Sequence, residues 1–387
     1  MIQREPCGHR LENRQTRGKI SNMKRRFIAA GLAIIVVAMY SPARARITSA
    51  SITSPFADLT QKKETDTHQK EKPKLQKPSE DSQGQKDKDK DKDKDEPVLK
   101  LGTDLVVLDV TVVDNSNKPV LDLKQDQFQV LEDKNPQKIE FFSREQSPVS
   151  LVFTIDTSGS MRAKLDTVIK ASTNLVKESR RGDEIAVIEF KLDPELLEEF
   201  TTDTNDVVDT LNGLIPGGQT AMLDALFLAA DYASKEGKNR RKAVVLVTDG
   251  IDKDSYYKFD EVVGHLREAD VQIYLIGFTN DLNSEGGLFR GKSEKDRSEA
   301  LLTKIATETG GRAFFPKELT EVHSIAQQIS NDLRTQYSIG YYPTNAKRDG
   351  TVRALRVLVN GGNQRLVART RTSYQAPRDS GAKPATK

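Results

Sequence analysis

Between residues 149 and 334 the chain alternates apolar, β-branched runs with longer segments whose apolar positions recur at helical spacing. Such alternation is typical of a doubly wound parallel sheet with helices on both faces. The expected strands are 149–156, 184–190, 242–249, 271–278 and 312–315, and the expected helices are 163–179, 205–214, 222–234, 259–269, 298–309 and 321–334. A short strand at 199–201 is expected to pair antiparallel at the sheet edge, because only a hairpin-length loop precedes it. The sequence therefore predicts a Rossmann-like α/β domain over residues 148–335.

Strand-like segments lie on both sides of this domain. The first flank, residues 101–146, has strand candidates at 104–113, 128–132 and 138–143, and the second flank, residues 336–375, has candidates at 337–342, 352–359 and 365–372. Neither flank has enough strands to bury an apolar face by itself. We therefore expect the flanks to pair into one small β-sandwich, and we expect residues 376–387 to be a disordered tail.

The amino-terminal region, residues 1–45, predicts an extension followed by a secretory signal peptide. Met23 opens a basic cluster, which is followed by the apolar run 27–40 and by Ala43-Arg44-Ala45. This order matches the three regions of an export signal with an A-x-A cleavage site. Translation is expected to begin at Met23 and cleavage to follow Ala45, although an uncleaved membrane anchor is an alternative. Both interpretations place the remaining chain in the periplasm, the cell envelope or the medium.

Residues 46–98 are poor in apolar side chains and rich in Lys, Asp, Glu, Gln and Pro. A segment of this composition cannot bury enough surface to fold, so we expect a disordered, charged linker. The whole chain has a formal net charge of only +3, which argues against a nucleic-acid partner. Its one cysteine, Cys7, excludes both an intrachain disulfide framework and a metal site built from cysteines.

Five polar side chains follow or border the ends of the predicted strands. They are Asp156, Ser158, Ser160, Thr220 and Asp249. In an open α/β sheet, ligands bind beyond the carboxyl ends of the strands, so we expect these side chains to meet at one edge. Carboxylate and hydroxyl oxygens without His or Cys suit Mg²⁺ or Mn²⁺ and disfavour zinc.

These residues resemble the metal-ion-dependent adhesion site of the von Willebrand factor A family. Its D-x-S-x-S motif matches Asp156, Ser158 and Ser160, and Thr220 and Asp249 match its remaining positions, so the motif is complete. The resemblance implies that the Ser and Thr hydroxyls touch the metal, whereas the two carboxylates act directly or through water. It also implies a protein-binding module and not an enzyme, in which an Asp or Glu of a partner protein completes the coordination of the cation.

The flanks carry a second resemblance, to secreted bacterial A-domain proteins of the acidobacterial type. Residues 120–142 look like the leader of those proteins, and Tyr341-Tyr342-Pro343 and the closing strands extend the resemblance over residues 101–374. The leader of that group commonly has Gly where Lys134 or Asn135 stands here. This departure is small, because Asn tolerates turn geometry.

Local structural roles are an alternative for each part of the candidate site. Thr220 is well placed to cap the helix at 222–234, and Ser158-Gly159-Ser160 resembles an ordinary helix entry. Asp249-Gly250 resembles an ordinary turn at the end of a strand. The joint arrival of these residues at one sheet edge favours a site over three separate coincidences.

The alternative function is a Mg²⁺-dependent phosphatase-like hydrolase of the cell envelope, because an Asp and a metal at a strand end can support phosphoryl transfer. This alternative lacks the second carboxylate of the expected D-x-D pair, because Ser158 stands at that position. Serine-hydrolase chemistry is disfavoured because the G-x-S-x-G elbow is absent and because His265 and His323 fall within expected helices. The phosphate-binding motifs of dinucleotide and nucleotide enzymes are absent after the first strand.

Overall fold

The computed structural model describes residues 72–77, 105–144, 146–249, 252–282 and 293–379. The predicted start at Met23, the signal peptide and most of the predicted linker lie outside the described residues. Within the described ranges, no helix combines the length and the apolar character that crossing a membrane requires.

A six-stranded sheet in the order β10-β9-β8-β5-β6-β7 forms the centre of the α/β domain. Its strands are β5 Val149–Asp156, β6 Glu184–Phe190, β7 Pro194–Thr201, β8 Arg241–Thr248, β9 Gln272–Gly277 and β10 Arg312–Phe314. Neighbouring strands are parallel except that β7 pairs antiparallel with β6 at the edge. The predicted doubly wound sheet and its antiparallel edge strand are confirmed, although β7 begins earlier in the chain than the sequence suggested.

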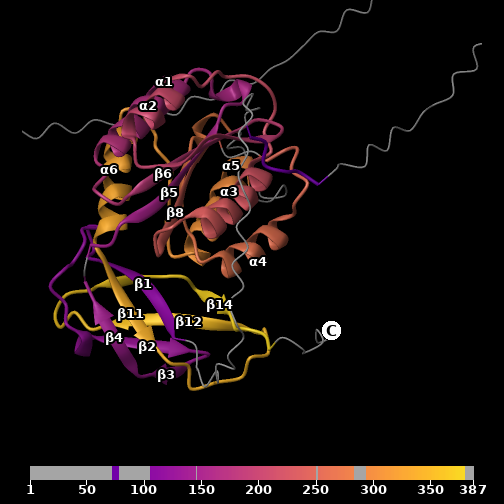
Figure 1. Ribbon diagram of the computed structural model, residues 1–387. Helices are drawn as coiled ribbons and strands as arrows, with labels where there is room; N and C mark the ends of the chain where they lie inside the picture. Colours follow the sequence, from indigo (N-terminus) through magenta and orange to yellow (C-terminus); the bar gives the residue numbers. More distant parts are fainter. Residues whose placement is uncertain (1–71, 78–104, 145, 250–251, 283–292, 380–387) are drawn as a thin grey trace, which may run out of the picture. The chain divides into compact units, whose positions relative to one another are not determined.

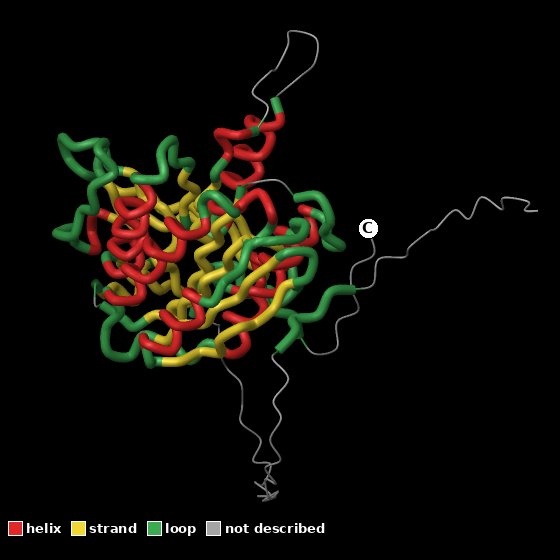
Figure 2. Tube along the Cα trace, turned by 90° about the horizontal axis from the view of Figure 1, so that it is seen from above, coloured by secondary structure: helices red, strands yellow, loops and turns green. Residues whose placement is uncertain are grey.

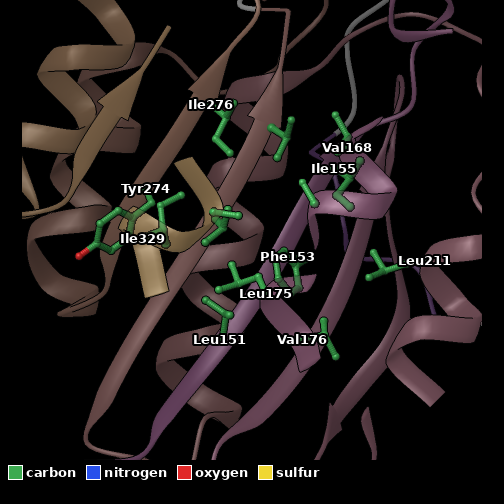
Figure 3. Packing of buried hydrophobic residues seen from close by; sticks show 14 of the residues in the cluster. Leu151, Phe153, Ile155, Val168, Leu175, Val176, Leu211, Tyr274, Ile276 and Ile329 are labelled. Carbon is green, nitrogen blue, oxygen red and sulfur yellow. The ribbon is translucent and has the colours of Figure 1, made fainter. Parts of the chain in front are cut away.

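Helices cover both faces of this sheet (Figure 1), and Figure 2 shows the same arrangement from above. They are α1 Leu165–Lys177, α2 Thr204–Asn212, α3 Met222–Glu236, α4 Phe259–Ala269, α5 Glu294–Glu308 and α6 Glu321–Arg334. Alternate residues of each strand point to opposite faces. Phe153 of β5 joins the buried cluster with α1, α2 and α6 (Figure 3), whereas Val152 joins the cluster with α3, α4 and α5. Burial on both faces explains why these strands read as continuous apolar runs.

The two flanks form two four-stranded antiparallel sheets, in the orders β13-β1-β11-β4 and β14-β12-β2-β3. The strands are β1 Val106–Val113, β2 Phe128–Glu132, β3 Asn135–Gln137, β4 Ile139–Ser143, β11 Gln336–Tyr341, β12 Val352–Val359, β13 Val367–Arg369 and β14 Ser373–Gln375. Each sheet takes strands from both flanks, and one buried cluster that includes Val110, Val130 and Tyr337 joins the sheets. The predicted β-sandwich built from both flanks is therefore confirmed.

Two details of the flanks differ from the sequence-based expectation. The predicted strand at 365–372 is reduced to β13, and β3 and β14 were not predicted. The β2–β3 turn places Asp133 and Lys134 at φ values of 47° and 69°. Glycine adopts this left-handed region without steric strain, so this turn is a position at which Gly is favoured. Past β14, Ala376 is still buried, and its N–H donates to the carbonyl of Thr351 at 2.9 Å.

The sandwich contacts the α/β domain at the amino ends of the parallel strands. Arg240, directly before β8, donates two hydrogen bonds to Asp109 of β1, at 2.8 and 3.1 Å. Gln336 of β11 donates to the side chain of Gln272, at the start of β9, at 2.7 Å. The carboxyl ends of these strands, where ligands bind in such sheets, lie at the opposite edge.

Deleting residues 337–387 is expected to expose the segment 105–143 to proteolysis, because β1, β2 and β4 lose the strands with which they pair. Limited proteolysis with mass mapping should show cleavage there roughly tenfold faster or more, as expected for strands without partners. The core strands of the α/β domain serve as the internal control, since their pairing does not involve the deleted residues. Unchanged resistance of the segment 105–143 would contradict the pairing.

Candidate functional site

The loop after β5 brings the three residues of the D-x-S-x-S motif together. Asp156, the last residue of β5, is fully buried, and its Oδ1 accepts the backbone N–H of Ser158 at 2.9 Å. The Oγ atoms of Ser158 and Ser160 are 3.1 Å apart. Ser158 is buried, whereas Ser160 is exposed. One carboxylate and two hydroxyl groups thus lie at the end of β5 and in the turn that follows it, where the 3₁₀ helix η2 spans Gly159–Met161.

The electrostatic environment of Asp156 is unusual for a carboxylate. Its Oδ2 accepts the hydroxyl hydrogen of Thr248, the last residue of β8, at 2.8 Å. Burial raises the pKa of Asp156 to about 6, hydrogen bonds from Ser158 and Thr248 act against this rise, and the nearby Asp249 carboxylate adds to it. The carboxylates of Asp156, at the end of β5, and Asp249, directly after β8, are therefore close enough to repel one another. A bound cation would relieve both the desolvation and the repulsion.

The loop that carries Thr220 is fastened to the β5 loop by backbone hydrogen bonds. The N–H of Gly217 donates to the carbonyl of Thr157 at 2.7 Å, and the N–H of Gly159 donates to the carbonyl of Gly218 at 3.2 Å. Gly218 has a φ of 89°, a conformation that glycine adopts without strain. These contacts position buried Thr220, two residues before α3, beside the motif loop.

The alternative that Thr220 caps α3 is wrong, whereas Ser158-Gly159-Ser160 does form a helix entry, that of η2. The N-cap of α3 is Ala221, and the N–H groups of the first turn are instead bonded by a distant loop. The N–H of Leu223 donates to Asp252 Oδ1 at 3.2 Å, and the N–H of the next residue donates to Ser255 Oγ, also at 3.2 Å. Ser158 occupies the N-cap position of η2 without a capping hydrogen bond from its side chain.

Two residues that the sequence reasoning missed organise the site. Thr248 holds the Asp156 carboxylate, and buried Asp224 of α3 accepts the N–H groups of Tyr256 and Tyr257, each at 2.8 Å. Asp224 thereby holds the loop after Asp249 against the start of α3. A charged residue among the Leu and Ala residues of a buried helix face was the available signal for Asp224. Thr248 gave no signal, because Thr is common in strands.

Loops after β8 and β9 lie near the same ends of the strands. The loop 252–258 contacts the start of α3, whereas residues 283–292 lie outside the described residues. His265 stacks on Phe227 with ring centroids 4.0 Å apart, and His323 Nδ1 is 3.1 Å from the side-chain amide of Asn174. His265 therefore packs against α3, and His323 is exposed on α6, so both lie within helices as expected.

The donor set is chemically specific. Two carboxylates and three hydroxyls are hard oxygen ligands, which suit Mg²⁺ or Mn²⁺. In the described ranges, no group of three or more His, Cys, Asp and Glu side chains gathers into a metal site. Two carboxylates formally balance the charge of a divalent cation, and five protein oxygens would leave one position of an octahedral site open for a further oxygen ligand.

Residues 151–251 match the family model of the von Willebrand factor type A domain, so the chain contains a domain of this class. Such domains commonly mediate protein interactions. The chain is 21% identical over 226 residues, 54% of this chain and 61% of the relative, to an uncharacterized protein of Borreliella burgdorferi. It is 29% identical over 210 residues, 50% of this chain and 32% of the relative, to the uncharacterized protein YfbK of Escherichia coli strain K12.

The chain thus spans less than two thirds of the length of either curated relative. Among solved structures, the von Willebrand factor type A protein from Catenulispora acidiphila matches 66% of this chain and 74% of its own chain. The sequence identity of that match is 13%, and the TM-score is 0.42.

Proposed function

We propose that this chain is an exported protein-binding module that holds one Mg²⁺ or Mn²⁺. The ligands are Asp156, Ser158, Ser160, Thr220 and Asp249, and a carboxylate from an Asp or Glu of a partner protein completes the coordination. The observation that carries the proposal is the pair of hydroxyl oxygens 3.1 Å apart beside a buried carboxylate whose pKa is raised to about 6. Burial makes the ionised carboxylate unfavourable by itself, and a hard cation beside it would offset that cost.

The chain's own residues divide the work of such a site. Asp156 and Asp249 supply negative charge, whereas Ser158, Ser160 and Thr220 supply neutral oxygens, which leave the cation electron-poor. When bound, the metal supplies a positively charged position that attracts a carboxylate. The loops are held to one another by backbone hydrogen bonds, such as that from Gly159 to Gly218. A site preorganised in this way binds without a large rearrangement.

Export is supported by the sequence at Met23 and by the apolar run that follows it. The proposed location is the periplasm, the cell envelope or the medium. Free divalent cations are available outside the cytoplasm, so a metal-dependent contact can form there. The same site explains protein binding without requiring a catalytic base, because a partner carboxylate is bound and not transformed.

Capture of a partner protein is expected to require the divalent cation. The full chain should retain an envelope protein in Mg²⁺ and release it in chelator, and the Ser158→Ala variant should retain it roughly tenfold less, because one hydroxyl ligand is lost. Exposed Ser116 in the β-sandwich provides the matched control variant, Ser116→Ala, which should bind like the parent.

Binding that is equal with and without chelator would contradict the proposal. Turnover of a generic phosphate ester in Mg²⁺, with no protein captured, would favour the hydrolase alternative instead. If a partner protein is captured in Mg²⁺, replacing the Asp or Glu with which it contacts the metal should abolish its binding in affinity measurements.

A further inference from the structure

A short segment of the predicted linker, residues 72–77, lies extended against the outer edge of β7, where Gln76 forms a single β-bridge. We call it the docking strand, and it is coloured indigo in Figure 1. Gln76 pairs in parallel with Glu195. Its N–H donates to the carbonyl of Pro194 at 3.4 Å, and its carbonyl accepts the N–H of Leu196 at 2.8 Å. The docking strand thus joins the edge of the central sheet at Gln76.

The side chains of the docking strand alternate as they do in a strand that lies on a surface. Pro73 and Leu75 are half-buried, whereas Gln76 and the three lysines are exposed. Leu75 packs against the buried cluster on the α3 and α4 face, which contains Leu196 and, at its margin, Phe200. Leu75 is therefore the apolar anchor of the docking strand.

The charges of the two strands are complementary. The docking strand carries three lysines, and β7 carries three acidic residues, which are Glu195, Glu198 and Glu199. The ammonium group of Lys77 pairs with the Glu199 carboxylate, and this hydrogen bond raises the pKa of Lys77 above its ordinary value. At the other end, Lys72 Nζ lies 6.0 Å from the centroid of the Tyr257 ring, within the range of a cation–π contact. Contacts at both ends and at Leu75 fix the register.

We propose that the outer edge of β7 and the adjoining surface form a strand-binding groove for an extended peptide that carries a leucine between lysines. The occupant is the docking strand of the same chain. Occupation covers the backbone groups of an edge strand, which are otherwise a template for pairing with other chains. It also attaches the linker to the loop that follows Asp249, because Lys72 lies over the ring of Tyr257 in that loop. The N–H of Tyr257 in turn donates to Asp224 of α3. The proposal is independent of metal binding.

Hydrogen exchange of the full chain tests the groove, with the amide of Leu196 as the reporter. This N–H donates to the docking strand and not to β6, so its exchange reports occupancy directly. Leu75→Ala removes the anchor and is expected to speed exchange at Leu196 about tenfold, as expected for a lost half-buried leucine. Lys74→Ala is the matched control, because Lys74 is exposed and is the neighbour of Leu75 in the sequence. Exchange at Leu196 in this variant should equal that in the parent.

A peptide added in trans tests the chemistry of the groove. In a full chain whose residues 72–77 are replaced by Gly and Ser, a synthetic peptide of residues 71–78 should restore protection at Leu196. A concentration of about 1 mM should suffice, because a flexible connection gives the attached strand an effective concentration of that order. The same peptide with alanine in place of its leucine should not restore protection.

Equal exchange at Leu196 in the parent and in Leu75→Ala would overturn the proposal, as would failure of the peptide to restore protection. Protein concentration separates the two possible sources of the strand. Protection that is unchanged on dilution supports docking within one chain. Protection that is lost on dilution means that a second copy supplies the strand, and it would overturn the intrachain assignment.

Discussion

Replacing Asp156 by Ala is expected to lower the affinity for Mg²⁺ by about 100-fold or more, because a carboxylate ligand at the end of β5 is lost. The fold should survive the change. Burial raises the pKa of Asp156 to about 6, so keeping this carboxyl ionised at neutral pH costs the metal-free protein folding free energy. Removing the side chain relieves that cost and the repulsion from Asp249. Titration calorimetry with Mg²⁺ and with Mn²⁺ measures the loss, and circular dichroism verifies folding.

The matched control is Asp209→Ala, which removes the same charge from an exposed position on α2, away from the strand ends. This variant should bind Mg²⁺ like the parent. Equal Mg²⁺ affinity in a folded Asp156→Ala variant would remove the metal site from consideration. That result would leave the strand-binding groove on β7 untouched, because exchange at Leu196 is measured without metal.

The long elements of the α/β domain were predictable because burial imposes a periodic pattern on them. The bounds of α4 and α6 coincide with those expected from apolar spacing alone, and the strands β5 and β8 are buried on both faces. Elements of three residues carry no such pattern. β3 contains Pro136, which favours a loop interpretation, and it forms a strand only because the turn at Asp133 returns the chain to β2.

The candidate site was predictable in position but not in its internal contacts. A topological rule places ligands at the carboxyl ends of the strands, so Asp156 and Asp249 were expected at one edge. The hydrogen bond from Thr248 to Asp156 joins residues of two different strands, and no sequence spacing reveals it. The docking strand was missed for a related reason. Its composition is that of a disordered linker, and its position depends on the surface that β7 presents.

Replacing Glu132 by Ala is expected to destabilise the β-sandwich by about 3 to 5 kcal/mol, as is typical when one partner of a buried charged group is removed. Glu132 is 2% exposed, and its Oε2 accepts hydroxyl hydrogens from Tyr341 at 2.7 Å and from Tyr374 at 2.9 Å. Burial raises the pKa of both tyrosines, so they stay protonated and donate. Arg353 Nη1, also in the sandwich, lies 3.8 Å from Glu132 Oε1. Alanine would leave two buried hydroxyls without their acceptor and a buried cation without a neighbouring negative charge.

Urea unfolding followed by near-ultraviolet circular dichroism measures this effect, because the chain has no Trp and the signal comes mainly from buried tyrosines. Glu132→Gln keeps the shape and one acceptor oxygen, so it should cost less than Glu132→Ala, about 1 to 3 kcal/mol. Asp126→Ala, at an exposed position of the same flank, should cost less than about 0.5 kcal/mol. If Glu132→Ala were no more destabilising than Asp126→Ala, the polar cluster would not hold the two flanks together, and their union would rest on the apolar cluster around Val110 and Val130 alone.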